Sequence, residues 1–204
     1  MKKELAHFTI GDSYGGNQDW FREPMMKLGG CGAETACDSS LYFTLHRGLD
    51  LYPFDIRDLS RRDYRRFGSR MRPYLSPRMR GIDRLDIYID GYASYLDDVG
   101  ERRIKMAEFQ GSRPYVEARQ AVRSQIDDGY PVPTLVLQHR DPRFKEYVWH
   151  WFLLNGYDER EDGFFVKAVT YSNYEWLNLA ALWDTGFEEK GGLVLYRLED
   201  APQP

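Results

Sequence analysis

The feature that most constrains this chain is a glycine-rich turn that runs directly into a helical segment carrying a cysteine. Gly29 and Gly30 precede Cys31, and small or apolar residues then recur at three- and four-residue spacing, as on one helix face. Glycine allows a sharp turn and a close approach by another group. The thiol is therefore expected at a helix N-terminus, where unpaired N–H groups and the macrodipole favour a thiolate. The alternative interpretation is a small buried cysteine in a tight turn.

Size and charge limit the classes of protein to consider. A chain of 204 residues with 42% hydrophobic content predicts one domain, 1–204, with a substantial core. A net charge of −4 provides no field that would attract nucleic acid, so no nucleic-acid partner is expected. No apolar run has the length of a signal peptide or a membrane span. We therefore expect a cytoplasmic protein with no membrane partner, in which Cys31 and Cys37 stay free thiols because one helix cannot easily bridge them.

Hydrophobic periodicity predicts an α+β fold, with a helical first half followed by an antiparallel sheet. Pro24 is expected to interrupt any helix around it. A loop over 156–163 is expected to close a central hairpin, and the tail 199–204 to be loose. The expected helices cover 34–49, 55–71, 82–96, 115–127 and 174–183, and the expected strands cover 103–109, 133–137, 147–154, 163–171 and 192–198.

The second chemical feature is His150, which opens an apolar strand that leads to Gly156-Tyr-Asp158. This strand and the Gly30-Cys-Gly-Ala33 segment resemble, in the same order, the histidine and cysteine segments of papain-like cysteine peptidases. They are also similar to the motifs of the related bacterial branch that trims double-glycine leader peptides. The separation of 119 residues (150 minus 31) is close to papain-type spacing. The resemblance does not extend to the segment 52–102.

The resemblance implies a papain-like fold, with the nucleophile helix packed on the C-terminal antiparallel sheet. It implies a cysteine hydrolase or acyltransferase, peptidase-like or amidase-like, acting on an amide or thioester of a peptide or small-molecule acyl substrate. Cys31 would be the nucleophile and His150 the base. In the family, the cysteine's own N–H and an upstream glutamine stabilise the oxyanion. Gln18 is the only upstream glutamine. Its alternative role is that of a loop amide bound to nearby backbone.

The third position of the family's triad departs from the pattern. The family has Asn or Asp on the strand that returns from the histidine, and here counting back through the hairpin gives Val169 or Thr170. Thr170 is able to accept a hydrogen bond from the imidazole, whereas Asn173 is expected beyond the strand end. We therefore expect a Cys31–His150 dyad. Because losing the orienting group can cost several powers of ten in rate, an inactive binding module of the same fold is the alternative.

Other functions find less support in the sequence. An inactive module would line its cleft with aromatic residues such as Trp20, Trp149, Trp151 and Tyr171. A third possibility is an interaction protein that presents the arginine-bearing segment 57–80 to an acidic partner, although a solvated helix face is the expected reading. His46, His139 and the two cysteines lack metal-ligand spacing. No metal or cofactor is therefore expected.

Overall fold

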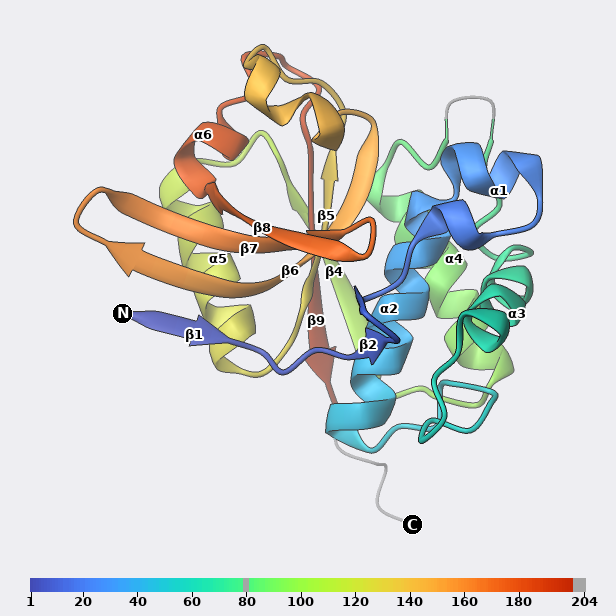
Figure 1. Ribbon diagram of the computed structural model, residues 1–204. Helices are drawn as coiled ribbons and strands as arrows, with labels where there is room; N and C mark the ends of the chain where they lie inside the picture. Colours follow the sequence, from blue (N-terminus) through green and yellow to red (C-terminus); the bar gives the residue numbers. More distant parts are fainter. Residues whose placement is uncertain (79–80, 200–204) are drawn as a thin grey trace.

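The computed structural model describes residues 1–78 and 81–199, and shows one antiparallel sheet with helices on both sides (Figure 1). The helices are α1 (Pro24–Gly29), α2 (Cys31–Arg47), α3 (Arg61–Met71), α4 (Leu85–Asp98), α5 (Tyr115–Asp127) and α6 (Leu179–Trp183), with 3₁₀ turns at Gln18–Trp20 and Pro142–Tyr147. The strands are β1 (Lys2–Glu4), β2 (Thr9–Ile10), β3 (Ser13–Tyr14), β4 (Ile104–Gln110), β5 (Val132–Val136), β6 (His150–Arg160), β7 (Gly163–Thr170), β8 (Asn173–Asn178) and β9 (Gly191–Leu198). The expected α+β class with an antiparallel sheet is confirmed.

The sheet is built around β6. Its strand order is β4-β9-β5-β6-β7-β8, and β1 pairs with the far end of β6. Every pairing in the described residues is antiparallel, including the β6–β7 hairpin that the sequence predicts. Antiparallel neighbours need only short connections, which is why the second half of the chain forms the sheet almost alone. The strands β2 and β3 form a separate two-stranded ribbon near the N-terminus.

Helix α2 lies between the sheet and the other N-terminal helices. Figure 1 shows α1, α2, α3 and α4 on one side of the sheet and α5 and α6 on the other. The first thirteen residues of α2 are all buried, so it lacks the exposed polar face of a surface helix. Small residues allow this packing: a Cβ at Gly32 would lie 3.0 Å from Ile82 and 3.6 Å from Trp151. Gly48, in the left-handed region with φ 66°, ends the helix.

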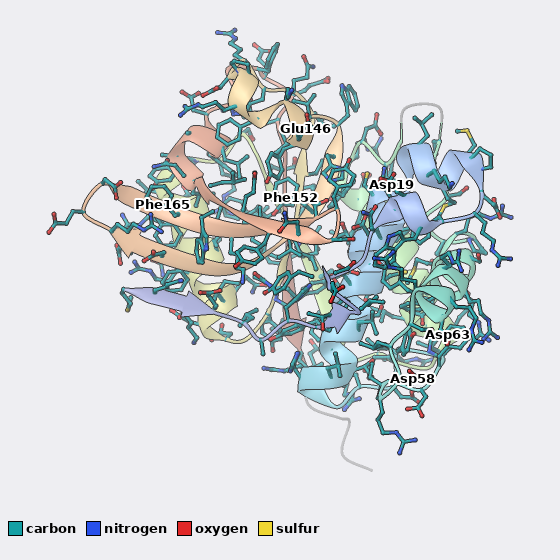
Figure 2. The ribbon with its side chains drawn as sticks, in the orientation of Figure 1. Asp19, Asp58, Asp63, Glu146, Phe152 and Phe165 are labelled. Atoms are coloured by element: carbon teal, nitrogen blue, oxygen red, sulfur yellow. The ribbon has the colours of Figure 1, made fainter. Side chains whose placement is uncertain are left out.

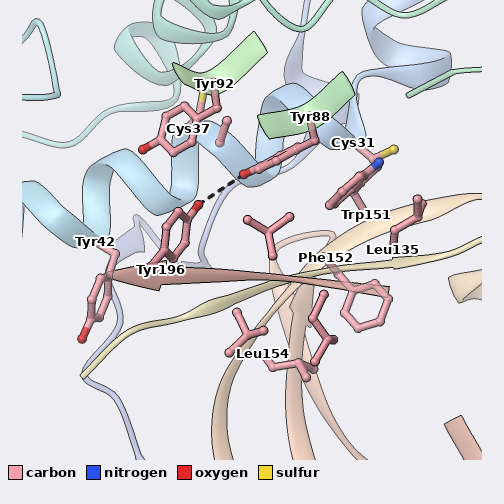
Figure 3. Packing of buried hydrophobic residues seen from close by; sticks show 14 of the residues in the cluster. Cys31, Cys37, Tyr42, Tyr88, Tyr92, Leu135, Trp151, Phe152, Leu154 and Tyr196 are labelled. Carbon is pink, nitrogen blue, oxygen red and sulfur yellow. Dashed lines mark hydrogen bonds between the residues drawn. The ribbon is translucent and has the colours of Figure 1, made fainter. Parts of the chain in front are cut away.

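The core between α2, α4 and β9 contains buried tyrosines whose hydroxyls bond one another and nearby serines. The Tyr88 and Tyr196 hydroxyls are 3.5 Å apart, and Tyr196 donates to Ser39 Oγ at 3.0 Å (Figure 3). The Tyr92 hydroxyl lies 2.9 Å from Ser40 Oγ. A buried hydroxyl without a partner would be destabilising. These pairs therefore explain why serines occupy the buried part of α2.

Several expected elements differ from the structure. Pro24 begins α1 instead of interrupting it. The N–H group at the first position of a helix makes no intrahelical hydrogen bond, so proline, which lacks that group, fits there. The expected helix at 174–183 is strand β8 followed by the short α6, since residues 173–178 pair with β7. Strand β6 continues through the expected loop to Arg160. Helix α3 begins at residue 61, where Ser60 accepts a hydrogen bond from the Asp63 N–H and caps the helix. The expected tail at 199–204 lies, apart from Glu199, outside the described residues.

The arginine-bearing segment 57–80 lies within the described residues except for 79–80. Some of its arginines have an acidic partner inside the same segment. Asp63 pairs with Arg62 and Arg66, and Figure 2 shows Asp63 on α3, with Asp58 near it. Exposed pairs of this kind contribute little stability, but they reduce the positive field of the segment. Within residues 1–78 and 81–199, no helix is both long and apolar enough to cross a membrane.

Candidate active site

His150 and Thr170 meet at one end of the β6–β7 hairpin. His150 begins β6, Thr170 ends β7, and the pairing of Leu153 with Val169 brings the two side chains to one face. A hydrogen bond of 2.6 Å joins His150 Nε2 to Thr170 Oγ1. The imidazole is buried, with 3% of its residue surface exposed. Of the two positions that the count allowed, Val169 and Thr170, the threonine bonds the imidazole, and the exposed Asn173 side chain accepts a hydrogen bond from the Tyr174 N–H.

Cys31 is the first residue of α2 and contacts β6 one residue beyond the histidine. The backbone of Trp151 hydrogen-bonds the thiol, and the Trp151 indole donates to the Ile82 carbonyl at 2.6 Å. Figure 3 shows Cys31 and Trp151 at this end of α2, with Cys37 farther along the helix. In the part of the chain that the structure describes, no hydrogen bond joins the thiol directly to the imidazole. The thiol thus contacts the backbone of the residue that follows His150 in β6.

Burial sets the charge state of both groups. It raises the pKa of the Cys31 thiol to about 11, although backbone hydrogen bonds from Trp151 and Gly32 favour the thiolate, and nearby Glu34 raises it further. Burial also lowers the pKa of His150 to about 4. Both groups are therefore neutral at pH 7. The expected thiolate at the helix N-terminus is wrong for this state, because desolvation of the thiol outweighs the helix dipole.

Gln18 lies against α2, the helix that begins with Cys31, although thirteen residues separate Gln18 from Cys31 in the chain. The intervening residues fold into a 3₁₀ turn and α1, and the Gln18 backbone N–H donates to Glu34 Oε2 at 3.0 Å, one turn from Cys31. Its side-chain amide donates to the Lys27 carbonyl at 2.9 Å, and its Oε1 is buried without a partner. One amide N–H is thus used by local backbone, which is the alternative role considered from the sequence.

Backbone strain is concentrated beside this pair. Among the described residues, the non-glycine residues with positive φ are Trp149 (53°), Tyr171 (49°) and Ser172 (64°). They flank His150 on one strand and Thr170 on the other. Left-handed conformations of such residues cost about 1–3 kcal/mol each and tend to occur where function requires them. No sequence pattern identified these positions, because aromatic residues and serine are ordinary at strand ends.

The sequence also missed a group of buried acidic residues farther along α2. Asp38 accepts a hydrogen bond of 2.6 Å from the Tyr64 hydroxyl and one of 3.1 Å from the Gly16 N–H. Burial raises the pKa of Asp38 to about 7 and that of Glu34 well above its usual range. Their four-residue spacing on a helix was a usable signal, but nothing in the sequence shows that this face is buried.

Two hollows adjoin Trp149, the residue before His150. One has a volume of about 400 Å³ and is lined mainly by apolar groups, among them Met25, Leu28 and Pro77. The other has a volume of about 500 Å³ and contains several carboxylates, including Glu188 and Glu189. The Trp149 side chain is 45% exposed between them. Among the described residues, no group of three or more His, Cys, Asp or Glu side chains is arranged to hold a metal ion.

Comparisons of the chain with protein-family models, with curated proteins and with solved structures found no match. They assign the chain to no family. The papain-like fold and the chemistry it implies therefore stay a proposal, supported by the arrangement of residues described above.

Proposed function

We propose that this protein is a cysteine-dependent acyl hydrolase or acyltransferase of papain-like fold, in which Cys31 is the nucleophile and His150 the base. The observation that carries the proposal is the 2.6 Å bond between His150 Nε2 and Thr170 Oγ1. It fixes the imidazole by one nitrogen and leaves Nδ1 for proton transfer. The conjunction of a buried thiol, an oriented imidazole and local backbone strain favours a reaction site over ordinary core packing.

The neutral state of both groups determines the mechanism. Cys31 Sγ attacks the carbonyl carbon of the substrate while His150 Nδ1 takes the thiol proton, so a C–S bond forms and the carbonyl electrons move to oxygen. Backbone N–H groups at the start of α2 are the nearest donors for that oxyanion. The imidazolium then protonates the leaving group as its bond to carbon breaks. Water or another nucleophile releases the acyl group from sulfur, with His150 again acting as base.

A neutral thiol is a weaker nucleophile than a thiolate, so reactive acyl groups are the preferred substrates. We expect thioesters and activated esters of a peptide or small acyl compound to react faster than ordinary amides. The absence of the family's direct hydrogen bond between thiol and imidazole in this state is compatible with catalysis, because such bonds often form only in the substrate complex.

The alternative is an inactive binding module, and one observation favours it. The pKa of about 11 for Cys31 and of about 4 for His150 make formation of an ion pair costly. Thr170, unlike a carboxylate, does not supply a charge that stabilises an imidazolium. Such a module would still bind acyl compounds beside Trp149, but it would not form an acyl–sulfur bond.

Mass spectrometry of the intact protein distinguishes the enzyme from the inactive binding module. The protein is first exposed to an acetyl aryl thioester and to peptide p-nitrophenyl esters. The enzyme should gain one acyl group, mapped to Cys31, which hydroxylamine removes. Cys31→Ala and His150→Ala should prevent the adduct, whereas Cys37→Ala and His139→Ala should retain it. The same yield of adduct in parent and His150→Ala would overturn the dyad. If no adduct forms with any of these reagents, while the same compounds bind in calorimetry, the binding module is the correct account.

A further inference from the structure

The ring of Tyr171 covers the imidazole of His150. The two ring centroids are 4.7 Å apart, and the planes differ by only 2°. Burial raises the pKa of Tyr171 to about 12, and a charge on nearby Cys31 contributes to the same shift. Its residue surface is 37% exposed, so the tyrosine forms the boundary between the buried histidine and solvent.

Tyr171 reaches this place through a strained turn. Tyr171 and Ser172 are the two central residues of the tight turn between β7 and β8, and both have positive φ, 49° and 64°. Turns of this type normally carry glycine or asparagine. The unfavourable conformation therefore needs support from neighbouring structure.

The N-terminal loop supplies that support. The Ser172 N–H donates to the Gly16 carbonyl at 2.9 Å, and the Tyr14 N–H donates to the Ser172 carbonyl at 3.0 Å. Gly16 in turn donates its N–H to Asp38 of α2 at 3.1 Å. A Cβ at Gly16 would lie 1.9 Å from the Tyr64 hydroxyl, so only glycine allows the loop to pass so close to α2. A continuous set of hydrogen bonds thus links the helix that carries Cys31 to the turn that carries Tyr171.

We propose that Tyr171 is a positioning residue, whose ring holds the imidazole of His150 in the orientation needed for proton transfer from Cys31, and that the loop 14–16 fixes this ring relative to α2. The proposal rests on the function proposed above. A single bond from Thr170 fixes one ring nitrogen but leaves the imidazole free to tilt about it. Contact across the whole ring face removes that freedom and keeps water from the same face.

Only the aromatic ring is required by this role. Tyr171→Phe keeps the stacking surface and loses only the hydroxyl, whereas Tyr171→Ala and Tyr171→Leu remove the aromatic contact. Phe187→Ala is the matched control, because Phe187 is an aromatic residue with the same exposure of 37% and makes no stacking contact with His150.

The test combines an NMR titration of the His150 ring nitrogens with kinetics on the acetyl aryl thioester, using the full chain. The parent, Tyr171→Phe and Phe187→Ala should show a His150 midpoint far below 6.5, in line with its burial. Tyr171→Ala and Tyr171→Leu should raise that midpoint by one pH unit or more, because water then reaches the ring. They should also lower kcat about tenfold with little change in KM, with the acid limb of the rate profile moving to higher pH.

Each outcome decides one question. If Tyr171→Leu is folded by circular dichroism and titrates like the parent, the positioning role is wrong. It is also wrong if Tyr171→Phe is as impaired as Tyr171→Ala, since the hydroxyl would then matter more than the ring. If the parent has no turnover but the Ala and Leu midpoints move as stated, the ring still positions His150 and the failure belongs to the proposed function.

Discussion

Two groups of polar and ionisable side chains lie around the first half of α2, and they use their hydrogen-bonding capacity differently. The carboxyl region consists of Glu34, Asp38 and Tyr64, and the dyad region of Cys31, His150 and Thr170. In the carboxyl region each Asp38 oxygen has a partner, the Tyr64 hydroxyl on one side and the Gly16 N–H on the other. In the dyad region His150 is held through one ring nitrogen by Thr170.

The comparison shows that burial and displaced pKa values do not by themselves identify a reaction site. The pKa of Asp38 is raised by about as much as the pKa of His150 is lowered, and burial is the main cause of both. What distinguishes the dyad region is a thiol that contacts the residue after the histidine, an imidazole held by Thr170 through one nitrogen, and three strained residues around them. The carboxyl region is structural: it joins the N-terminal loop to α2.

The largest expected difference separates the two cysteines, which lie on the same helix in these contrasting surroundings. Cys31→Ala should reduce thioester turnover at least ~10³-fold, because it removes the nucleophile. Cys37→Ala should leave turnover within about twofold but lower stability by roughly 1 kcal/mol, since a fully buried side chain is truncated. Turnover rates and urea unfolding check both. An equal loss of turnover in the two variants would show that Cys31 and Cys37 do not differ in the way proposed, as nucleophile and structural thiol.

The second prediction concerns the opposite pH dependence of the two regions. The Asp38 pKa is raised from 3.8 to about 7, so its contribution to stability is complete at low pH and is lost as pH rises from about 4 to 7. The His150 pKa is lowered from 6.5 to about 4, so its contribution is complete above 6.5 and is lost as pH falls toward 4. At about 1.4 kcal/mol per pKa unit, the loss is on the order of 4 kcal/mol for Asp38 and roughly 3 kcal/mol for His150.

Urea midpoints measured between pH 4 and pH 8 test these windows. Asp38→Asn should reduce the loss on raising pH, since the amide can accept from Gly16 and donate to Tyr64 without a charge. The rest of that loss is assigned to Glu34, whose pKa burial also raises. His150→Gln should reduce only the loss on the acid side. The remaining acid-side loss is assigned to His7, which burial also keeps neutral. If Asp38→Asn changes the acid side instead, the assignment of the two regions is reversed.

The third prediction tests the bond from Thr170 to His150. Thr170→Val should lower kcat about tenfold with KM unchanged, because the imidazole loses its orienting partner. Thr170→Asn should match or exceed the parent if a side-chain amide orients the ring better than a hydroxyl. Thr134→Val is the control: Thr134 is a buried strand threonine whose hydroxyl donates to the Val132 carbonyl, away from His150. A kcat unchanged in Thr170→Val would show that this bond is not used.

The smallest expected effect comes from the strained turn. Ser172→Gly should raise stability by roughly 0.5–1 kcal/mol, because glycine adopts a positive φ without a steric penalty. Gly15→Ala should act in the opposite direction, since the new Cβ would lie 2.9 Å from Asp38 Oδ2 at φ 79°. Thermal unfolding of the two variants measures the contrast. If the Ser172→Gly variant were less stable than the parent, the contacts of the Ser172 side chain would stabilise the fold by more than its positive φ costs.

Elements whose signals lie within a few residues could be predicted from the amino-acid sequence. The helix at 115–127 has the bounds that its periodicity predicts, and Gly129 follows it with positive φ. Cys31 begins a helix, and Thr170 meets His150, because alternation along a hairpin fixes which residues share a face. These features depend on neighbours within a few residues or on one short hairpin.

The remaining features depend on packing between segments that are far apart in the chain. The segment 173–178 is a strand because its backbone pairs with β7, although the sequence had predicted a helix there. The thiol of Cys31 is neutral because segments far apart in the chain exclude water from it. The strain at Tyr171 persists because the N-terminal loop bonds its turn. Desolvation and conformational support are properties of the packed whole, and no window of sequence contains them.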